Sequence, residues 1–125
     1  MLLLRSLLYF VGSIISLILI TLCGLFLVFA NYSTRHKFLS QWAIFCIWWL
    51  KITLNITTNI IGQENVNKSP CIIISNHQST WETLAFQSIF PAHTWVLKKE
   101  LLWLPIFGWS LALLKPIIIN RGDKL

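Results

Sequence analysis

The sequence predicts a membrane-attached α/β protein, in which an N-terminal helical hairpin precedes a small, mostly parallel α/β layer. Two observations support this fold class. Hydrophobic residues make up 56% of the 125 residues and charged residues only 11%, as in chains that face lipid over part of their length. Beyond residue 54, the long apolar stretches give way to short β-branched runs that alternate with helical patterns. We therefore divide the chain into a membrane element, residues 1–54, and an α/β part, residues 55–125.

The first expected element is a membrane anchor. Residues 7–31 contain no charged side chain, and about 20 apolar residues are enough to cross the core of a bilayer. A cleaved signal peptide is the alternative, because Arg5 gives the chain a basic start. The apolar stretch is much longer than the roughly 7 to 15 apolar residues of a signal peptide. The sequence therefore favours an anchor.

The second expected element is a helix over residues 38–54 that lies in the membrane interface or re-enters it. Three polar residues interrupt this apolar stretch, and it contains three tryptophans, which prefer the headgroup level. These residues are Ser40, Gln41 and Lys51, and Trp42, Trp48 and Trp49. Basic residues flank the first helix on both sides, at Arg5 and at residues 35–37. A hairpin with both ends on the cytoplasmic face of the membrane would explain this symmetry.

The α/β part consists of short elements. We expect strands at residues 56–61, 71–75, 94–97 and 116–120, and helices at residues 79–90, 99–103 and 107–114. The strand at residues 71–75 is expected to be buried, because it is a continuous apolar run. In parallel sheets, ligands bind beyond the carboxyl ends of the strands. Asn76, His77 and Arg121 directly follow two of the expected strands. We therefore expect the functional site at this edge of the sheet.

Charge and cysteine content narrow the possible partners. The formal charge of +6 comes from small basic clusters along the chain, which suit anionic lipid, phosphate or a nucleotide. Nucleic acid is not expected, because the aromatic residues lie inside apolar runs and do not alternate with basic ones. Cys23, Cys46 and Cys71 lack any paired spacing, so we expect buried free thiols and no metal site.

His77 and Glu82 form a candidate catalytic pair. A histidine at a strand end can act as a general base near neutral pH, and a carboxylate on its other ring nitrogen stabilises the imidazolium. Residues five apart on a helix point about 140° away from each other, so His77 must precede the helix that contains Glu82. The nucleophile could be Ser79, Ser75 or a hydroxyl of the substrate.

The same residues allow a structural interpretation. The stretch STWE at residues 79–82 fits a capping box, in which Glu82 bonds back to the amide of Ser79 and stabilises the helix start. His77 would then be a loop residue without a partner. Spacing alone leaves both interpretations open. His36 and His93 have no carboxylate near them in sequence, and we expect both to be ordinary surface or interface residues.

Two stretches together resemble the signatures of the lysophosphatidate acyltransferase family. The stretch NHQS at residues 76–79, with Glu82, resembles the first, which reads His, four residues, then usually Asp. Residues 98–101, 104–108 and 116–121 resemble the second, in order and at plausible spacing. The resemblance covers about residues 62–121. Glu82 replaces the usual Asp, and the family's third signature, an acidic residue followed by Gly, Thr and Arg, does not occur in the 125 residues. We therefore expect the N-terminal portion of such an enzyme, or a truncated version.

The resemblance implies a 1-acyl-sn-glycerol-3-phosphate acyltransferase that makes phosphatidate. His77 would deprotonate the hydroxyl of lysophosphatidate, and Glu82 would orient His77. The acyl donor would be acyl-CoA or acyl carrier protein, with no cofactor and no metal. Arg121 would hold the substrate phosphate, with an ion pair to another residue of the chain as the alternative. Further contacts to substrate would come from Lys98, Lys99, Asn76 and Ser79, and the two lysines could equally form a basic rim that faces the membrane.

Three other functions fit parts of the sequence. An acyltransferase for a different lysolipid would use the same site. A non-catalytic membrane protein could bind anionic lipid through its basic clusters. A serine hydrolase could use Ser79 with His77.

Overall fold

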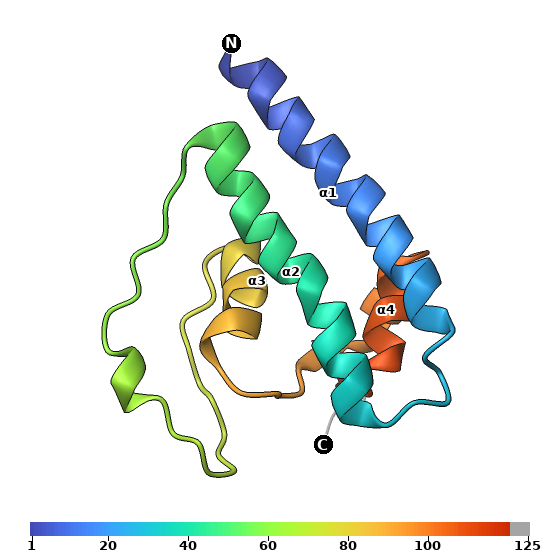
Figure 1. Cartoon of the computed structure of the whole chain (residues 1–125). Coiled ribbons are helices and arrows are strands. Elements are labelled where there is room, and N and C mark those ends of the chain that lie inside the picture. The colour runs from blue at the N-terminus through green and yellow to red at the C-terminus, as the bar shows by residue number, and fades with distance from the viewer. Residues whose placement is uncertain (121–125) are drawn as a thin grey trace.

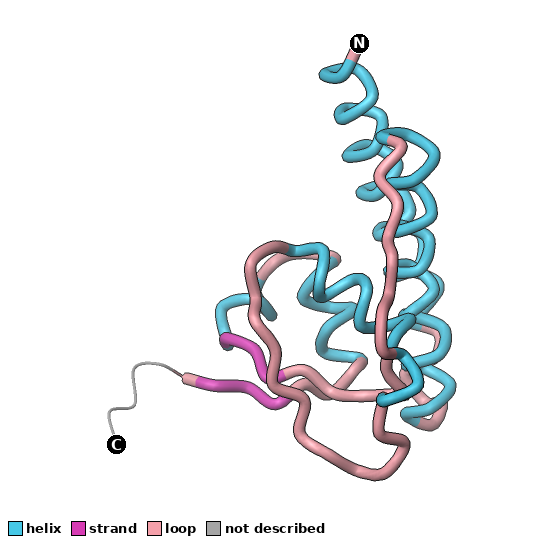
Figure 2. Tube along the Cα trace, turned by 90° about the vertical axis from the view of Figure 1, so that its left-hand side faces the viewer, coloured by secondary structure: helices cyan, strands magenta, loops and turns pink. Residues whose placement is uncertain are grey.

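The computed structural model describes residues 1–120 and consists of a pair of long helices with smaller elements packed against it (Figure 1). In chain order the elements are α1 (Leu2–Leu25), α2 (Tyr32–Leu54), the 3-10 helix η1 (Gln63–Asn65), α3 (Thr80–Ile89), β1 (Val96–Lys98), the 3-10 helix η2 (Lys99–Trp103), α4 (Phe107–Leu113) and β2 (Ile117–Ile119). Helix α3 packs on α2, and α4 packs on α1. Figure 2 shows the long helices along one side and the strands on the other.

Helix α1 corresponds to the expected anchor. Within the described residues it is the one helix long and apolar enough, by length and composition, to cross a membrane. Its 24 residues extend over about 36 Å, compared with about 30 Å for the core of a bilayer. Most of its large apolar side chains are exposed in the structure. This helix is therefore compatible with attachment to a membrane.

Helix α2 begins six residues earlier than expected and lies antiparallel to α1 (Figure 1). Asn31 caps it, because its side-chain oxygen accepts a hydrogen bond from the amide of Thr34 at 2.8 Å. The indole nitrogens of Trp42 and Trp49 donate to the carbonyl oxygens of Ser13 and Leu8 on α1. Two of the three tryptophans that suggested a headgroup position therefore join the two helices.

Two expected strands are absent from the described part of the chain. Residues 56–61 and 71–75 belong to no helix and form no ladder with a neighbouring strand in the described part of the chain. The expectation that residues 71–75 form a buried strand is wrong, because Ile72 and Ile74 are 90% and 92% exposed. A strand requires a partner to complete its backbone hydrogen bonds, which a short apolar run cannot provide for itself.

The other expected elements occur within a few residues of their predicted positions. Strands β1 and β2 pair in parallel, with Val96 opposite Ile117 and Lys98 opposite Ile119. The parallel pairing is confirmed, but the described sheet has two strands. Elements η2 and α4 form the crossover between these strands, as parallel pairing requires. Residues 99–103 form a 3-10 helix rather than an α-helix.

The apolar core of the described chain is small. Its five buried apolar residues lie mainly on α2, with one each from α3 and α4: Leu39, Ala43, Cys46, Ala85 and Leu113. The three cysteines are free thiols. Cys46 is buried as expected, whereas Cys23 and Cys71 are exposed, so the expectation of burial is wrong for those two.

Candidate active site

The start of α3 brings His77 and Glu82 together. Ser79 is the N-cap of α3, and His77 lies two residues before it in an extended segment. Glu82 belongs to the first helical turn, and its Oε2 lies 3.6 Å from Nδ1 of His77. This distance exceeds that of a hydrogen bond, but such contacts are often long in the absence of substrate. The two side chains can therefore act as a pair.

The capping box is present as well. Oε2 of Glu82 accepts a hydrogen bond from the amide of Ser79 at 2.9 Å, and Oε1 accepts one from the amide of Gln78 at 3.1 Å. In return, the hydroxyl oxygen of Ser79 accepts a hydrogen bond from the amide of Trp81 at 3.2 Å. The two interpretations that spacing left open are compatible, because one carboxylate both stabilises the helix start and faces His77.

The local hydrogen bonds hold Glu82 in its charged form. Its own backbone amide contributes most to lowering the pKa of the carboxyl group, and the amides of Gln78 and Ser79 and the Ser79 hydroxyl add to this effect against a cost of desolvation. The carboxylate is therefore ionised at neutral pH. The side chain of Glu82 is 17% exposed and that of His77 is 66% exposed. The face of the imidazole that points away from Glu82 is thus open to a substrate.

Ser79 serves the helix start rather than His77. Its hydroxyl lies 3.1 Å from Oε2 of Glu82, to which it donates, and its oxygen accepts from Trp81. A serine nucleophile would instead donate to the histidine that activates it. This arrangement gives no support to the hydrolase interpretation.

The remaining predicted site residues lie on other parts of the chain. Asn76 is exposed and directly precedes His77. Lys98 ends β1 and Lys99 begins η2, and both are exposed. In the described residues, no hydrogen bond or ion pair joins these lysines to His77 or Glu82. Arg121 lies outside the described residues.

The Pro-x-x-Gly part of the second stretch shapes the crossover between the strands. The amide of Phe107 donates to the carbonyl oxygen of Pro105 at 2.7 Å, which closes a three-residue turn. Ile106 at its centre has φ 66° and ψ −62°, a strained conformation for a β-branched residue. A Cβ atom at Gly108 would collide with the backbone carbonyl of Leu102. The Pro-x-x-Gly spacing therefore has a structural cause, which lies in this turn and in the close approach of Gly108 to Leu102.

Comparison with known proteins identifies the family. The family model described as Acyltransferase matches residues 57–125, more than half of the chain and the part that contains both signature-like stretches. The chain belongs to the acyltransferase family. This confirms the resemblance at the level of the family.

Several curated relatives have the name 1-acyl-sn-glycerol-3-phosphate acyltransferase. The one from Pseudomonas aeruginosa is 45% identical over 93 residues, which cover 74% of this chain and 36% of the relative. The one from Saccharomyces cerevisiae is 30% identical over 123 residues, which cover 94% of this chain and 41% of the relative. The chain thus spans less than half the length of these relatives. No solved structure shows significant similarity.

Proposed function

We propose that the protein acylates lysophosphatidate to form phosphatidate in phospholipid biosynthesis. The observation that carries this proposal is the His77–Glu82 pair at the start of α3, inside the segment that the acyltransferase model matches. The names of the relatives in a bacterium and in yeast support lysophosphatidate as the substrate.

In the proposed mechanism, His77 is the general base. Its Nδ1 faces Glu82, which leaves Nε2 to remove the proton from the free hydroxyl of lysophosphatidate. The hydroxyl oxygen forms a bond to the carbonyl carbon of the acyl thioester. The tetrahedral intermediate then breaks its carbon–sulfur bond, and the thiolate leaves with the proton from the His77 imidazolium. No acyl-enzyme forms.

Glu82 stabilises the positive charge that develops on His77 during this reaction. Because its pKa is lowered, the carboxylate stays ionised while the imidazole gains and loses the proton. A positioned base contributes about 10²- to 10⁴-fold in rate, so the remaining acceleration must come from substrate positioning and stabilisation of the oxyanion.

The substrates define where the site must lie. Lysophosphatidate is a membrane lipid, and the apolar helix α1 would hold the protein at its surface. Acyl-CoA and acyl carrier protein are both water-soluble donors, so we expect the site to face the cytoplasm. Lys98, Lys99 and Arg121 would supply positive charge for the substrate phosphate.

Reconstitution of the full-length protein in lipid vesicles tests the proposal. Lysophosphatidate would be supplied with either acyl-CoA or acylated carrier protein, and the product would be measured by mass spectrometry. We expect phosphatidate with at least one donor and a preference for lysophosphatidate over lysophosphatidylcholine and lysophosphatidylethanolamine in competition. Absence of phosphatidate with both donors, or preference for another lysolipid, would contradict the proposal.

A further inference from the structure

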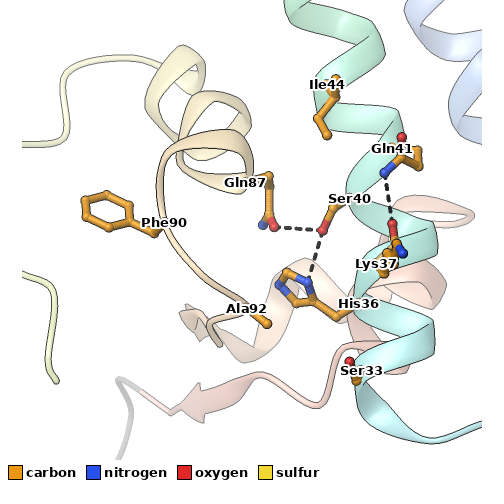
Figure 3. Close-up of a pocket in the computed structure, with 9 residues that line it drawn as sticks. All are labelled: Ser33, His36, Lys37, Ser40, Gln41, Ile44, Gln87, Phe90 and Ala92. Atoms are coloured by element: carbon orange, nitrogen blue, oxygen red, sulfur yellow. Dashed lines mark hydrogen bonds between the residues drawn. The ribbon is translucent and has the colours of Figure 1, made fainter. Parts of the chain in front are cut away.

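A buried polar cluster joins α2 to α3 and to the segment between α3 and β1. His36 and Ser40 occupy successive turns of α2, and Gln87 belongs to α3 (Figure 3). His93 lies in the segment that follows α3. His36 is 6% exposed and Ser40 is 7% exposed. Buried polar groups are costly unless they are hydrogen-bonded, so contacts here are expected to be specific.

The hydrogen bonds of this cluster form a relay with one consistent direction. The amide of His93 donates to Nε2 of His36 at 3.4 Å, so Nε2 is an acceptor and the proton of the neutral ring is on Nδ1. Nδ1 of His36 then donates to the hydroxyl oxygen of Ser40 at 3.2 Å. The Ser40 hydroxyl donates in turn to Oε1 of Gln87 at 3.0 Å. The neutral form of His36 is therefore compatible with all three hydrogen bonds of the relay.

The relay attaches both ends of one short segment, residues 87–93, to α2. Gln87 lies in the last turn of α3, and His93 lies three residues before β1. The hydroxyl of Tyr32, on the first turn of α2, donates to the carbonyl oxygen of His93 at 3.0 Å and adds a second hold on the same segment. Helix α3 has only 10 residues, so its attachment to α2 also sets the position of its first turn, where Glu82 faces His77.

We propose that His36 is a positioning residue, which as a neutral imidazole fixes α3, and with it the His77–Glu82 pair, on the long helix α2. This inference rests on the proposed acyltransferase function. It gives a role to a histidine that the sequence alone indicated to be ordinary. The role depends on the protonation state of the ring, because protonated Nε2 can no longer accept a hydrogen bond from His93.

The surroundings of His36 disfavour its protonation. The titratable groups that face it are His93, whose ring centroid is 5.8 Å away, and Tyr32 on its own helix; α3 presents the uncharged Gln87. Lys37 lines the same cleft, of about 250 Å³, which opens to solvent beside the relay. Burial, and then the neighbouring His93, lower the pKa of His36. Neutral His36 therefore stabilises the attachment of α3 to α2 fully above the ordinary histidine pKa of about 6.5. This stabilisation is lost as the pH falls through the lower pKa of His36 in the folded protein.

Two variants of the full-length protein in vesicles test this role. His36→Gln removes the titratable ring, and Ser40→Ala breaks the relay at its centre with little change in volume. Gln41→Ala is the matched control, because Gln41 lines the same cleft but, among the described residues, its side chain bonds only to the carbonyl of Lys37 on its own helix. For each protein, kcat and KM for lysophosphatidate would be measured between pH 5 and pH 8, and hydrogen–deuterium exchange would be followed over residues 80–95.

Displacement of a catalytic group by about 1 Å can lower the rate by about 10²-fold, so we expect His36→Gln to lower kcat by about 10- to 100-fold with little change in KM. The slope of the acid limb of log kcat against pH should be lower in His36→Gln than in wild type by up to about one, because the variant lacks one group whose protonation lowers kcat. If His36 had only a structural role that did not depend on its protonation, its replacement would not change the number of protons whose binding lowers kcat. Ser40→Ala should also lower kcat. If His36→Gln fails to fold, the kcat of Ser40→Ala tests whether the relay positions the catalytic pair.

Wild-type kcat and a wild-type acid limb in His36→Gln or, where that protein does not fold, wild-type kcat in Ser40→Ala would overturn the inference. Failure of the wild-type protein to acylate lysophosphatidate would instead contradict the proposed function. Hydrogen–deuterium exchange would then test the attachment of α3 to α2 independently of activity. Faster exchange over residues 80–95 in His36→Gln than in Gln41→Ala supports the attachment, and equal exchange overturns it.

Discussion

A single carboxylate, that of Glu82, combines two kinds of contact at the start of α3. It accepts hydrogen bonds from the amides of Gln78 and Ser79, and it faces His77 at 3.6 Å. The capping motif allows glutamate or glutamine at this position, whereas stabilisation of an imidazolium requires the negative charge. The structural role and the proposed catalytic role of Glu82 can therefore be separated by substitution.

Glu82→Gln should lower the rate of acylation while the helix start stays capped. We expect a loss of at least about tenfold in kcat, because the imidazolium of His77 loses its countercharge. The thermal unfolding midpoint should change little, since the glutamine oxygen can still accept from the amide of Ser79. Ser79→Ala is the complementary control and should lower stability by about 1 kcal/mol through loss of the cap. If Glu82→Gln instead lowered kcat only as far as it lowered the fraction of folded protein, Glu82 would act only as a cap.

The titration of Glu82 should reflect the same hydrogen bonds. Because the folded pKa is lowered, Glu82 stabilises the folded chain above its ordinary pKa of about 4.3, and this contribution is lost as the pH falls through the folded value. Carboxyl ¹³C chemical shifts in micelles should give a midpoint below the ordinary value. In Ser79→Ala the midpoint should rise part of the way back. A midpoint at the ordinary value in both proteins would contradict the hydrogen-bonding arrangement.

The proximity of His77 and Glu82 was predictable from sequence because the two residues are local. The five-residue spacing of His77 and Glu82 required a turn before a helix, and α3 begins as that argument demands. The dual use of Glu82 was not predictable, because spacing fits both a dyad and a cap. The burial of His36 and its link to His93 could not be predicted either, since these residues are 57 apart in sequence.

Among the secondary-structure elements, Gly24 and Gly108 mark close approaches of different kinds. A Cβ atom at Gly24 would lie 2.8 Å from a methyl group of Leu39 on α2, whereas one at Gly108 would meet the backbone of Leu102. A side-chain methyl can rotate away, but a backbone carbonyl in a tight turn cannot.

Gly108→Ala should therefore destabilise the protein more than Gly24→Ala. We expect a loss of about 1 to 3 kcal/mol for Gly108→Ala, as in other overpacked sites. Gly24→Ala should be close to neutral, because alanine favours the helix by about 1 kcal/mol over glycine and offsets the contact with Leu39. Thermal unfolding of the two variants in micelles provides the comparison. The reverse order would show that the crossover is looser than the structure indicates.

The elements differ in how far sequence determines them. Long apolar or amphipathic stretches predicted α1, α2 and α3, because a helix completes its backbone hydrogen bonds within itself. The apolar runs at residues 56–61 and 71–75 did not become strands, because a strand depends on a distant partner that no local pattern specifies. The tryptophans of α2 were interpreted from their preference for headgroups, but Trp42 and Trp49 bond to α1.

At the scale of the whole molecule, α1 is the part that would keep the site at a lipid surface. Its apolar side chains include Ile15, which is 53% exposed near the middle of the helix. An arginine at the centre of a membrane helix costs about 2.5 to 3.5 kcal/mol for insertion.

Ile15→Arg should therefore release the full-length protein from membranes more readily than wild type. We expect a larger fraction in the supernatant after extraction at alkaline pH, measured by quantitative immunoblotting, and Ile15→Leu should behave as wild type. If Ile15→Arg were retained as fully as Ile15→Leu, α1 would not be the membrane anchor.

The most direct test of the central claim is the rate of phosphatidate formation by full-length His77→Ala in vesicles. Lys68→Ala, in the exposed loop before α3, serves as the matched control. We predict a loss of about 10²- to 10⁴-fold in kcat for His77→Ala and none for Lys68→Ala, with both proteins inserted to the same extent. A His77→Ala protein with the wild-type rate would contradict the assignment of this pair as the catalytic centre.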